Sequence, residues 1–199
     1  MKIGIIGAGA IGQAVARQVV TAGHDALLSN SRGPDSLREI VQQLGARARA
    51  VTTQEAAGAE IVVLSVPWSA VPQALASLPP WNNRILIDAT NPVVQPGFKL
   101  AELGGKTSSQ VVASLAPGAR VVKAMNTLLA KVLGSNPREA GGHRVVFMSG
   151  DDAAAKKTVA GLIEEFGFAT IDLGTLATGS GLQQFPGGPL PTLNLIKIG

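Results

Sequence analysis

The chain begins with a short apolar run that is followed directly by apolar residues at helical spacing. The run is Ile3 to Ile6, and the helical positions after it are Ile11, Val15 and Val19, with Gly23 at the expected helix end. An apolar run without interspersed polar residues is typical of a strand that is buried on both faces of a parallel sheet. This opening segment therefore predicts a strand, a turn and a helix.

The same alternation of strand and helix patterns continues along the chain. Further apolar runs predict strands at 26–28, 47–51, 61–64, 84–88, 120–123, 144–148 and 168–173. Helical spacing predicts helices at 37–44, 53–59, 69–78, 108–115 and 151–166. This rhythm indicates an α/β, Rossmann-like, doubly wound fold with a mostly parallel sheet over residues 1–174. Residues 175–199 are richer in Gly, Pro and Thr and are expected to form a short C-terminal extension.

A G-x-G-x-x-G motif joins the first predicted strand to the first predicted helix. Its residues are Gly7, Ala8, Gly9, Ala10, Ile11 and Gly12. The first glycine of this motif permits a tight turn, the second lets the backbone approach a pyrophosphate, and the third brings helix and strand together. The pyrophosphate would lie on unpaired N–H groups at the positive end of the helix dipole. Because the motif stands in the required strand–turn–helix context, it predicts a dinucleotide-binding site.

The residues after the second predicted strand indicate which dinucleotide is bound. Asn30, Ser31 and Arg32 stand there, and no Asp or Glu occupies the strand tip as it usually does in an NAD site. A hydroxyl group and a guanidinium suit a 2′-phosphate instead. The sequence therefore favours NADP(H) over NAD. The alternative, a plain turn that leads into Pro34, is compatible with this prediction because such a turn would present Arg32.

Ligands of a doubly wound sheet bind beyond the carboxyl ends of its strands. The residues at these ends are Ser65, Val66 and Pro67 after the fourth predicted strand, Asn91 after the fifth and Asn126 after the sixth. Such small polar groups and prolines suit the positioning of a nicotinamide ring. Lys123 and Asn126 are the candidates for catalytic proton transfer, and a structural lysine that extends along the sheet is the alternative for Lys123.

Composition excludes several classes of protein. The 199 residues include no cysteine and no tyrosine, which removes thiolate metal sites and the Tyr-Lys pair of short-chain dehydrogenases. With two histidines and no ligand spacing, we expect no metal. The net charge of +4 comes from scattered residues, so we expect no nucleic-acid partner. No apolar run approaches the roughly twenty residues that span a bilayer. We therefore expect a cytoplasmic protein without a membrane partner.

The residues at the carboxyl ends of the predicted strands include few proton donors, and this bears on the type of reaction. Carbonyl reduction normally needs a proton donor, whereas hydride transfer between two rings chiefly requires that they stack in register. The expected activity is NADPH-dependent hydride transfer to a small-molecule electron acceptor. Two alternatives stay open: a small β-hydroxyacid dehydrogenase or imine reductase-like enzyme that uses Lys123 and Asn126, and a non-catalytic NADPH-binding sensor.

Six segments along the chain resemble the family of coenzyme F420-dependent NADP oxidoreductases. They read GIIGAGAIG, SNSRGP, VLSVPW, IDATNP, VVKAMNTL and GGPLPTLNLIK. The resemblance implies a Rossmann-like fold, reversible hydride exchange between NADPH and a deazaflavin, and 2′-phosphate binding by Ser31 and Arg32. It also implies that the deazaflavin lies over the nicotinamide near Pro67, Asn91, Asn126 and residues 186–189. The NADP domain of ferric reductases, which pass electrons through a flavin, is similar too, so a flavin is a second candidate acceptor.

The C-terminal segment 175–199 has apolar residues at Leu190, Leu193 and Ile196. These side chains are expected either to close over the active site or to pack across a homodimer interface. The segment is therefore predicted to complete the site or to mediate association.

Overall fold

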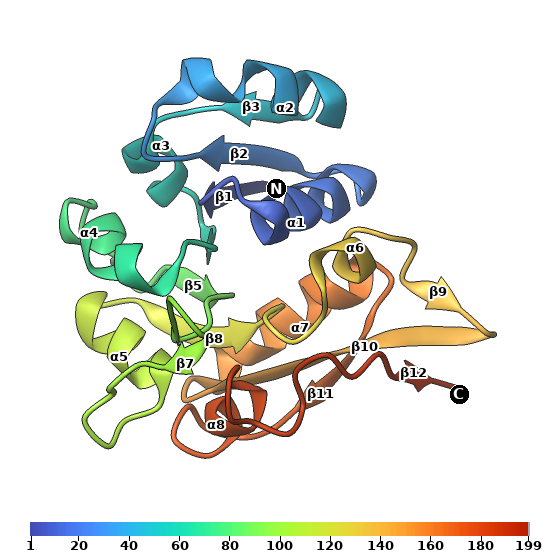
Figure 1. The fold of residues 1–199 in the computed structure, drawn as a ribbon. Coiled ribbons are helices and arrows are strands. Elements are labelled where there is room, and N and C mark those ends of the chain that lie inside the picture. Colours follow the sequence, from blue (N-terminus) through green and yellow to red (C-terminus); the bar gives the residue numbers. More distant parts are fainter. Residues whose placement is uncertain (199) are drawn as a thin grey trace.

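Within residues 1–198, which the computed structural model describes, ten strands form one central sheet (Figure 1). The eight along its main path are β1 (Lys2–Ile6), β2 (Asp25–Ser29), β3 (Ala48–Ala50), β4 (Ile61–Leu64), β5 (Ile85–Asp88), β8 (Arg120–Ala124), β10 (Gly142–Gly150) and β11 (Ala169–Asp172). Two short strands, β9 (Arg138–Glu139) and β12 (Ile196–Lys197), pair with β10. A separate hairpin consists of β6 (Val93–Val94) and β7 (Lys99–Leu100).

The spatial order of the main strands is β11-β10-β8-β5-β4-β1-β2-β3. Pairing is parallel throughout this path except between β8 and β10, which run antiparallel. The chain winds from β1 outward to β3 and then returns to the other side of β1 with β4. This reversal between β1 and β4 leaves a crevice at their carboxyl ends, where doubly wound sheets bind their ligands.

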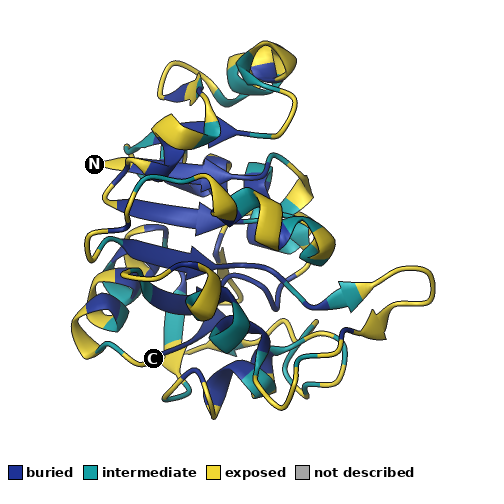
Figure 2. Ribbon diagram, turned by 90° about the vertical axis from the view of Figure 1, so that its left-hand side faces the viewer, coloured by how far each residue is buried: buried dark blue, intermediate teal, exposed yellow. Residues whose placement is uncertain are grey.

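Helices cover both faces of the sheet (Figure 1). One face packs against α1 (Ala10–Thr21), α2 (Arg38–Leu44), α6 (Ala130–Leu133) and α7 (Ala153–Glu165). The other face packs against α3 (Thr53–Ala57), α4 (Val71–Ala76), α5 (Ser108–Leu115) and α8 (Gly179–Gln183). Successive strand residues alternate between the two cores, so that Ile5 belongs to the first and Ile6 to the second. Figure 2 shows the strands buried between helices whose outer surfaces are exposed.

The predicted α/β architecture with a mostly parallel sheet is confirmed. The strand at Ile61–Leu64 and the helix at Ser108–Leu115 have the predicted bounds. The predicted helix 69–78 is instead a 3-10 turn, η2 (Trp68–Ala70), followed by α4. Pro72 has no N–H to donate to the preceding turn, but it fits in the first turn of a new helix.

Two other predicted elements differ from the structure in their bounds. The predicted strand 144–148 extends over Gly142–Gly150, since β8, β9 and β12 all pair along it. The helix predicted at 37–44 begins as a 3-10 turn, η1 (Pro34–Leu37), before α2. The strands β6, β7, β9 and β12 and the helices α6 and α8 were not predicted. None exceeds five residues, which is too short for a periodic pattern.

The C-terminal segment packs along its own domain. The N–H of Thr192 donates to the carbonyl of Thr127 at 2.7 Å, and the N–H of Val145 donates to the carbonyl of Leu195 at 2.9 Å. The Arg144 guanidinium bonds Asn194 in this segment and Glu139 in β9. Of the predicted apolar residues, Leu190 and Ile196 are half-buried and Leu193 is exposed. None of the helices in residues 1–198 combines the length and the apolarity that crossing a bilayer requires.

Candidate nucleotide-binding cleft

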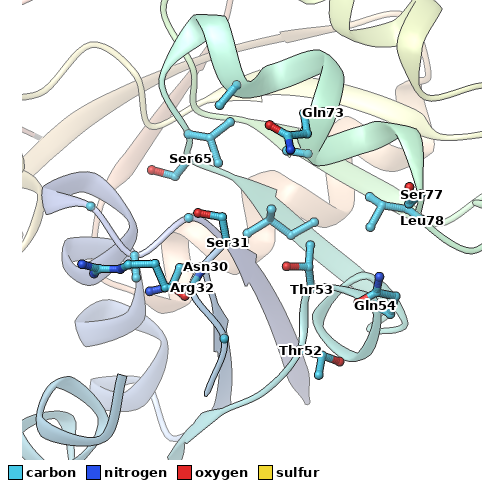
Figure 3. Close-up of a pocket in the computed structure, with 18 of the residues that line it drawn as sticks. Asn30, Ser31, Arg32, Thr52, Thr53, Gln54, Ser65, Gln73, Ser77 and Leu78 are labelled. Atoms are coloured by element: carbon cyan, nitrogen blue, oxygen red, sulfur yellow. Dashed lines mark hydrogen bonds between the residues drawn. The ribbon is translucent and has the colours of Figure 1, made fainter. Parts of the chain in front are cut away.

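A cleft of about 700 Å³ opens at the carboxyl ends of β1, β2 and β4 (Figure 3). Nine of the predicted site residues line it: Gly7, Ala8, Gly9, Asn30, Ser31, Arg32, Ser65, Val66 and Pro67. Figure 3 shows Asn30, Ser31 and Arg32 on one side of the cleft and Gln73, Ser77 and Leu78 on the other. The structure thus brings together the turn at Gly7–Gly9, the loop at Asn30–Arg32 and the residues after β4, which are far apart in the sequence.

Gly7 and Gly12 are required by close packing. Gly7 has a φ of +108°, and a Cβ at this position would lie 2.0 Å from the carbonyl oxygen of Ser65. A Cβ on Gly12 would lie 1.9 Å from the carbonyl oxygen of Gly7. Both contacts involve backbone atoms, which cannot move aside as a side chain can. These two glycines therefore hold β1, α1 and β4 close together.

Gly9 differs from its two neighbours in the motif. Its φ is −72°, and a Cβ there would meet no atom within 4 Å. Gly9 is the N-cap residue of α1, and no side chain caps the first turn of this helix. The start of α1 therefore has backbone N–H groups without a side-chain cap, next to open space at Gly9. A helix N-terminus with this geometry binds an anion such as a pyrophosphate.

These differences predict opposite effects for two alanine substitutions. Gly9→Ala should leave thermal stability almost unchanged but weaken NADPH binding at least about tenfold, a loss of roughly 1.4 kcal/mol, because the methyl group fills the space of the pyrophosphate. Gly12→Ala should instead destabilise the fold by about 1–3 kcal/mol through overpacking. Thermal unfolding and fluorescence titration with NADPH measure the two effects. Unchanged NADPH affinity in Gly9→Ala would remove the pyrophosphate from this turn.

The loop after β2 is shaped by the side chain of Asn30. Its Oδ1 accepts hydrogen bonds from the N–H of Arg32 at 3.0 Å and from the Ser36 hydroxyl at 3.2 Å. Asn30 therefore orients the loop that carries Ser31 and Arg32. Arg38 forms an ion pair with Asp35 at 2.6 Å, whereas Arg32 has no carboxylate partner among residues 1–198. The exposed Arg32 guanidinium is thus available to an anionic ligand.

The opposite side of the cleft was not predicted from the sequence. It consists of residues at the start of α3 and of residues in or directly beside α4, namely Thr52, Thr53, Gln54, Ala70, Gln73, Ala74, Ser77 and Leu78. One local signal marks its beginning, because Thr52 and Glu55 form a capping box. The hydrogen bonds that Glu55 accepts from the backbone N–H and hydroxyl of Thr52 lower the pKa of this carboxyl from its ordinary value of 4.5.

Six predicted site residues do not line the cleft. They are Ala10, Ile11, Gly12, Asn91, Lys123 and Asn126. Ala10 lies exposed in the first turn of α1, and Ile11 packs against the core. Asn91 and Asn126 lie beside each other, since the Asn126 Nδ2 donates to the Asn91 Oδ1 at 2.9 Å. Asn91 follows β5, which is next to β4 in the sheet, and Asn126 follows β8, on the other side of β5.

Lys123 lies in the core rather than at the cleft. Its side chain is 0% exposed, and its Nζ lies 3.3 Å from the Oδ2 of Asp88, which is equally buried. The ammonium also donates to the carbonyl of Thr90 at 2.9 Å, and the Ser109 hydroxyl donates to Asp88 at 2.6 Å. Burial lowers the pKa of Lys123 from its ordinary value of 10.5, an effect that Asp88 partly opposes. A substrate in the cleft cannot reach this ammonium, which also does not extend to the sheet edge.

Known proteins resemble this chain in sequence. Residues 2–92 match the family model described as NADP oxidoreductase, coenzyme F420-dependent. The chain is 29% identical to the metalloreductase STEAP3 of Rattus norvegicus over 192 residues. The match covers 96% of this chain and 37% of STEAP3, so the chain spans little more than a third of that relative.

Solved structures share the fold over nearly the whole chain. A hypothetical protein from Sinorhizobium meliloti is 44% identical with a TM-score of 0.94, and the match covers 99% of this chain and 96% of the other. A protein from an Arthrobacter species, described as an F420-dependent NADP-reductase, is 28% identical with a TM-score of 0.75. That match covers 92% of this chain and 89% of the Arthrobacter protein.

Proposed function

Because the chain belongs to the family of coenzyme F420-dependent NADP oxidoreductases, we propose that it transfers hydride between NADP(H) and a deazaflavin or flavin ring. The observation that carries the proposal is the composition of the cleft. Its lining combines the uncapped N-terminus of α1 at Gly9 with the guanidinium of Arg32, which has no carboxylate partner in the described part of the chain. None of the described residues that line it carries a carboxylate. The cleft therefore suits a dinucleotide with an additional phosphate.

The chain's residues fit NADP(H) from one end of the cleft to the other. The first turn of α1 would hold the pyrophosphate in the space left open at Gly9. Ser31 and Arg32 would bind the 2′-phosphate through charge-assisted hydrogen bonds. The adenine would then lie between these residues and the side formed by Thr52–Gln54 and α4. The nicotinamide end would extend past Ser65, Val66 and Pro67 toward Asn91.

The residues around the proposed nicotinamide end favour a planar ring as hydride acceptor over a carbonyl or an imine. When bound, NADPH supplies the hydride, and a ring acceptor needs no strong acid from the protein. Lys123, the candidate donor for carbonyl or imine reduction, is enclosed in the core. Beside Asn91, the exposed Phe185 offers an apolar surface against which a planar ring could pack, and its N–H donates to Asn91 at 3.1 Å.

A hydride-exchange assay tests the proposed function. The protein should oxidise NADPH and reduce coenzyme F420 in equal molar amounts, with much less activity when NADH replaces NADPH. The absorption bands of the reduced nicotinamide and the oxidised deazaflavin report the two changes, and free flavins are assayed in parallel. Turnover with an imine or carbonyl but no ring acceptor would overturn the proposal. Tight NADPH binding without turnover on any acceptor would identify a sensor instead.

A further inference from the structure

The amide of Asn126 is fully engaged inside the protein. Its Nδ2 donates to the Oδ1 of Asn91 at 2.9 Å and to the backbone carbonyl of Gln183 at 2.7 Å. Its Oδ1 accepts from the Nε2 of Gln183 at 3.3 Å, and the residue is 6% exposed. A side-chain amide has two N–H groups. Asn126 therefore has no N–H left to offer to a ligand.

Asn91 has a different balance of donors and acceptors. Its Oδ1 accepts from Asn126 and from the N–H of Phe185, which occupies both lone pairs. One N–H of its Nδ2 donates to the carbonyl of Asn126 at 3.0 Å. The second N–H meets no acceptor in residues 1–198, and the residue is half-buried. Asn91 thus keeps a single donor whose direction is set by its three other bonds.

Gln183 fixes this arrangement from the C-terminal segment. It is 0% exposed, its Nε2 donates to the carbonyl of Phe147 at 3.0 Å, and its Oε1 accepts from the Ser149 hydroxyl at 2.8 Å. These bonds tie α8 to β10. In the loop that presents Asn126, the buried Met125 has a φ of +63°, a conformation that a bulky residue keeps only when its surroundings enforce it. Met125 directly precedes Asn126, whose side-chain amide is held by Asn91 and Gln183.

We infer that Gln183 is a positioning residue that, through Asn126, directs the free N–H of Asn91 toward the carboxamide oxygen of the nicotinamide. The inference rests on the proposed function, because it requires NADP(H) in the cleft. β5 pairs with β4 in parallel up to Leu64 and Asp88, so Asn91 and Pro67 both follow the carboxyl ends of neighbouring strands, at the end of the sheet where the nicotinamide would lie. In this arrangement Asn91 contacts the cofactor, and Asn126 acts only through it.

Side-chain amide signals in an NMR spectrum of the ¹⁵N-labelled protein test the inference without turnover. NADP⁺ should shift one of the two Asn91 amide protons and leave both Asn126 protons in place. The probe 2′,5′-ADP lacks the nicotinamide, so it should shift signals of the Arg32 loop and leave Asn91 unchanged. A shift at Asn126, or no shift at Asn91 although both probes bind, overturns the inference. If neither probe binds, the proposed function itself fails.

Replacement of Gln183 separates positioning from a general structural role. Gln183→Met removes the side-chain hydrogen bonds at similar volume, so NADP⁺ should bind about tenfold more weakly, as expected for the loss of one good hydrogen bond. The affinity for 2′,5′-ADP should not change. A general structural role would weaken both probes alike, and that result would overturn the inference. Gln184→Met is the matched control, because the neighbouring amide has no bond to Asn126 within the described chain.

Two further variants keep the test decisive if Gln183→Met does not fold. Ser149→Ala removes only the bond to the Gln183 Oε1 and should weaken NADP⁺ binding selectively, though less. Asn91→Ala should reproduce the selective loss, and Ser149→Ala should then add nothing to it, since residues that act through one another are not additive. Full additivity of the two substitutions would contradict positioning through Asn91.

Discussion

Replacing Arg32 by alanine should raise the KM for NADPH by roughly 10- to 100-fold and leave the KM for NADH almost unchanged. A hydrogen bond to a charged group contributes about 1.5–3 kcal/mol, and each 1.4 kcal/mol corresponds to a factor of ten. Among the described residues that line the cleft, Arg32 is the one with a positive charge, and none has a carboxylate that would compete for the guanidinium. Only NADPH carries the 2′-phosphate, so the effect should be specific to it. Steady-state kinetics with both cofactors, or direct titration, measures the ratio.

Arg38 provides the matched control for this prediction. It stands six residues further along the chain, its guanidinium is paired with Asp35 at 2.6 Å, and its side chain is 78% exposed. Because exposed ion pairs contribute little, Arg38→Ala should change neither stability nor cofactor preference appreciably. Arg32→Lys should fall between the wild type and Arg32→Ala, since an ammonium retains charge but loses the bidentate geometry. An equal loss of NADPH and NADH binding in Arg32→Ala would refute the assignment.

The second large effect is expected from Lys123→Met, and it concerns stability. Removal of the ammonium leaves the Asp88 carboxylate uncompensated in the core, although Thr90 and Ser109 still donate hydrogen bonds to it. Breaking a buried pair on one side typically costs about 3–5 kcal/mol. The additional substitution Asp88→Asn should recover most of this loss, because it removes the unpaired charge. Urea unfolding of these two variants and the wild type gives the free energies.

The pH dependence of stability supplies a second test of the same pair. Burial lowers the pKa of Lys123 in the folded state, so between that pKa and the ordinary value of 10.5 the unfolded chain binds more protons than the folded one. Stability rises with pH wherever this holds. The stability of the wild type relative to Lys123→Met should therefore increase as the pH rises toward 10.5. A folded Lys123→Met with unchanged stability but no hydride transfer would restore a catalytic role.

Much of the lining of the cleft was predictable because its parts are local in sequence. The turn at Gly7–Gly12 needs only a strand, a glycine-rich bend and a helix in succession. The absence of a carboxylate after β2 is likewise visible in the residues themselves. Both features lie within a single strand–turn–helix unit or at one strand end, where backbone geometry follows from neighbouring residues.

The other side of the cleft and the amide network could not be predicted in this way. Gln183 and Asn126 are 57 residues apart, and they meet because α8 packs on β10. Nothing in the residues around Gln183 distinguishes it from its neighbour Gln184. The same holds for Lys123, whose position at the end of a strand suits either a site or a core. Its burial follows from the register that places it opposite Asp88.

The sequence by itself determined the strand–helix alternation and the glycine-rich turn, and it predicted the preference for NADP(H), because each depends on residue types at short spacing. The tertiary structure decided which polar groups remain free. Folding pairs Lys123 with Asp88 and gives hydrogen-bond partners to the whole side-chain amide of Asn126. One N–H of Asn91 has no acceptor among the described residues. Whether a donor is satisfied depends on the atoms that folding brings to it, and these come from strands and helices far away along the chain.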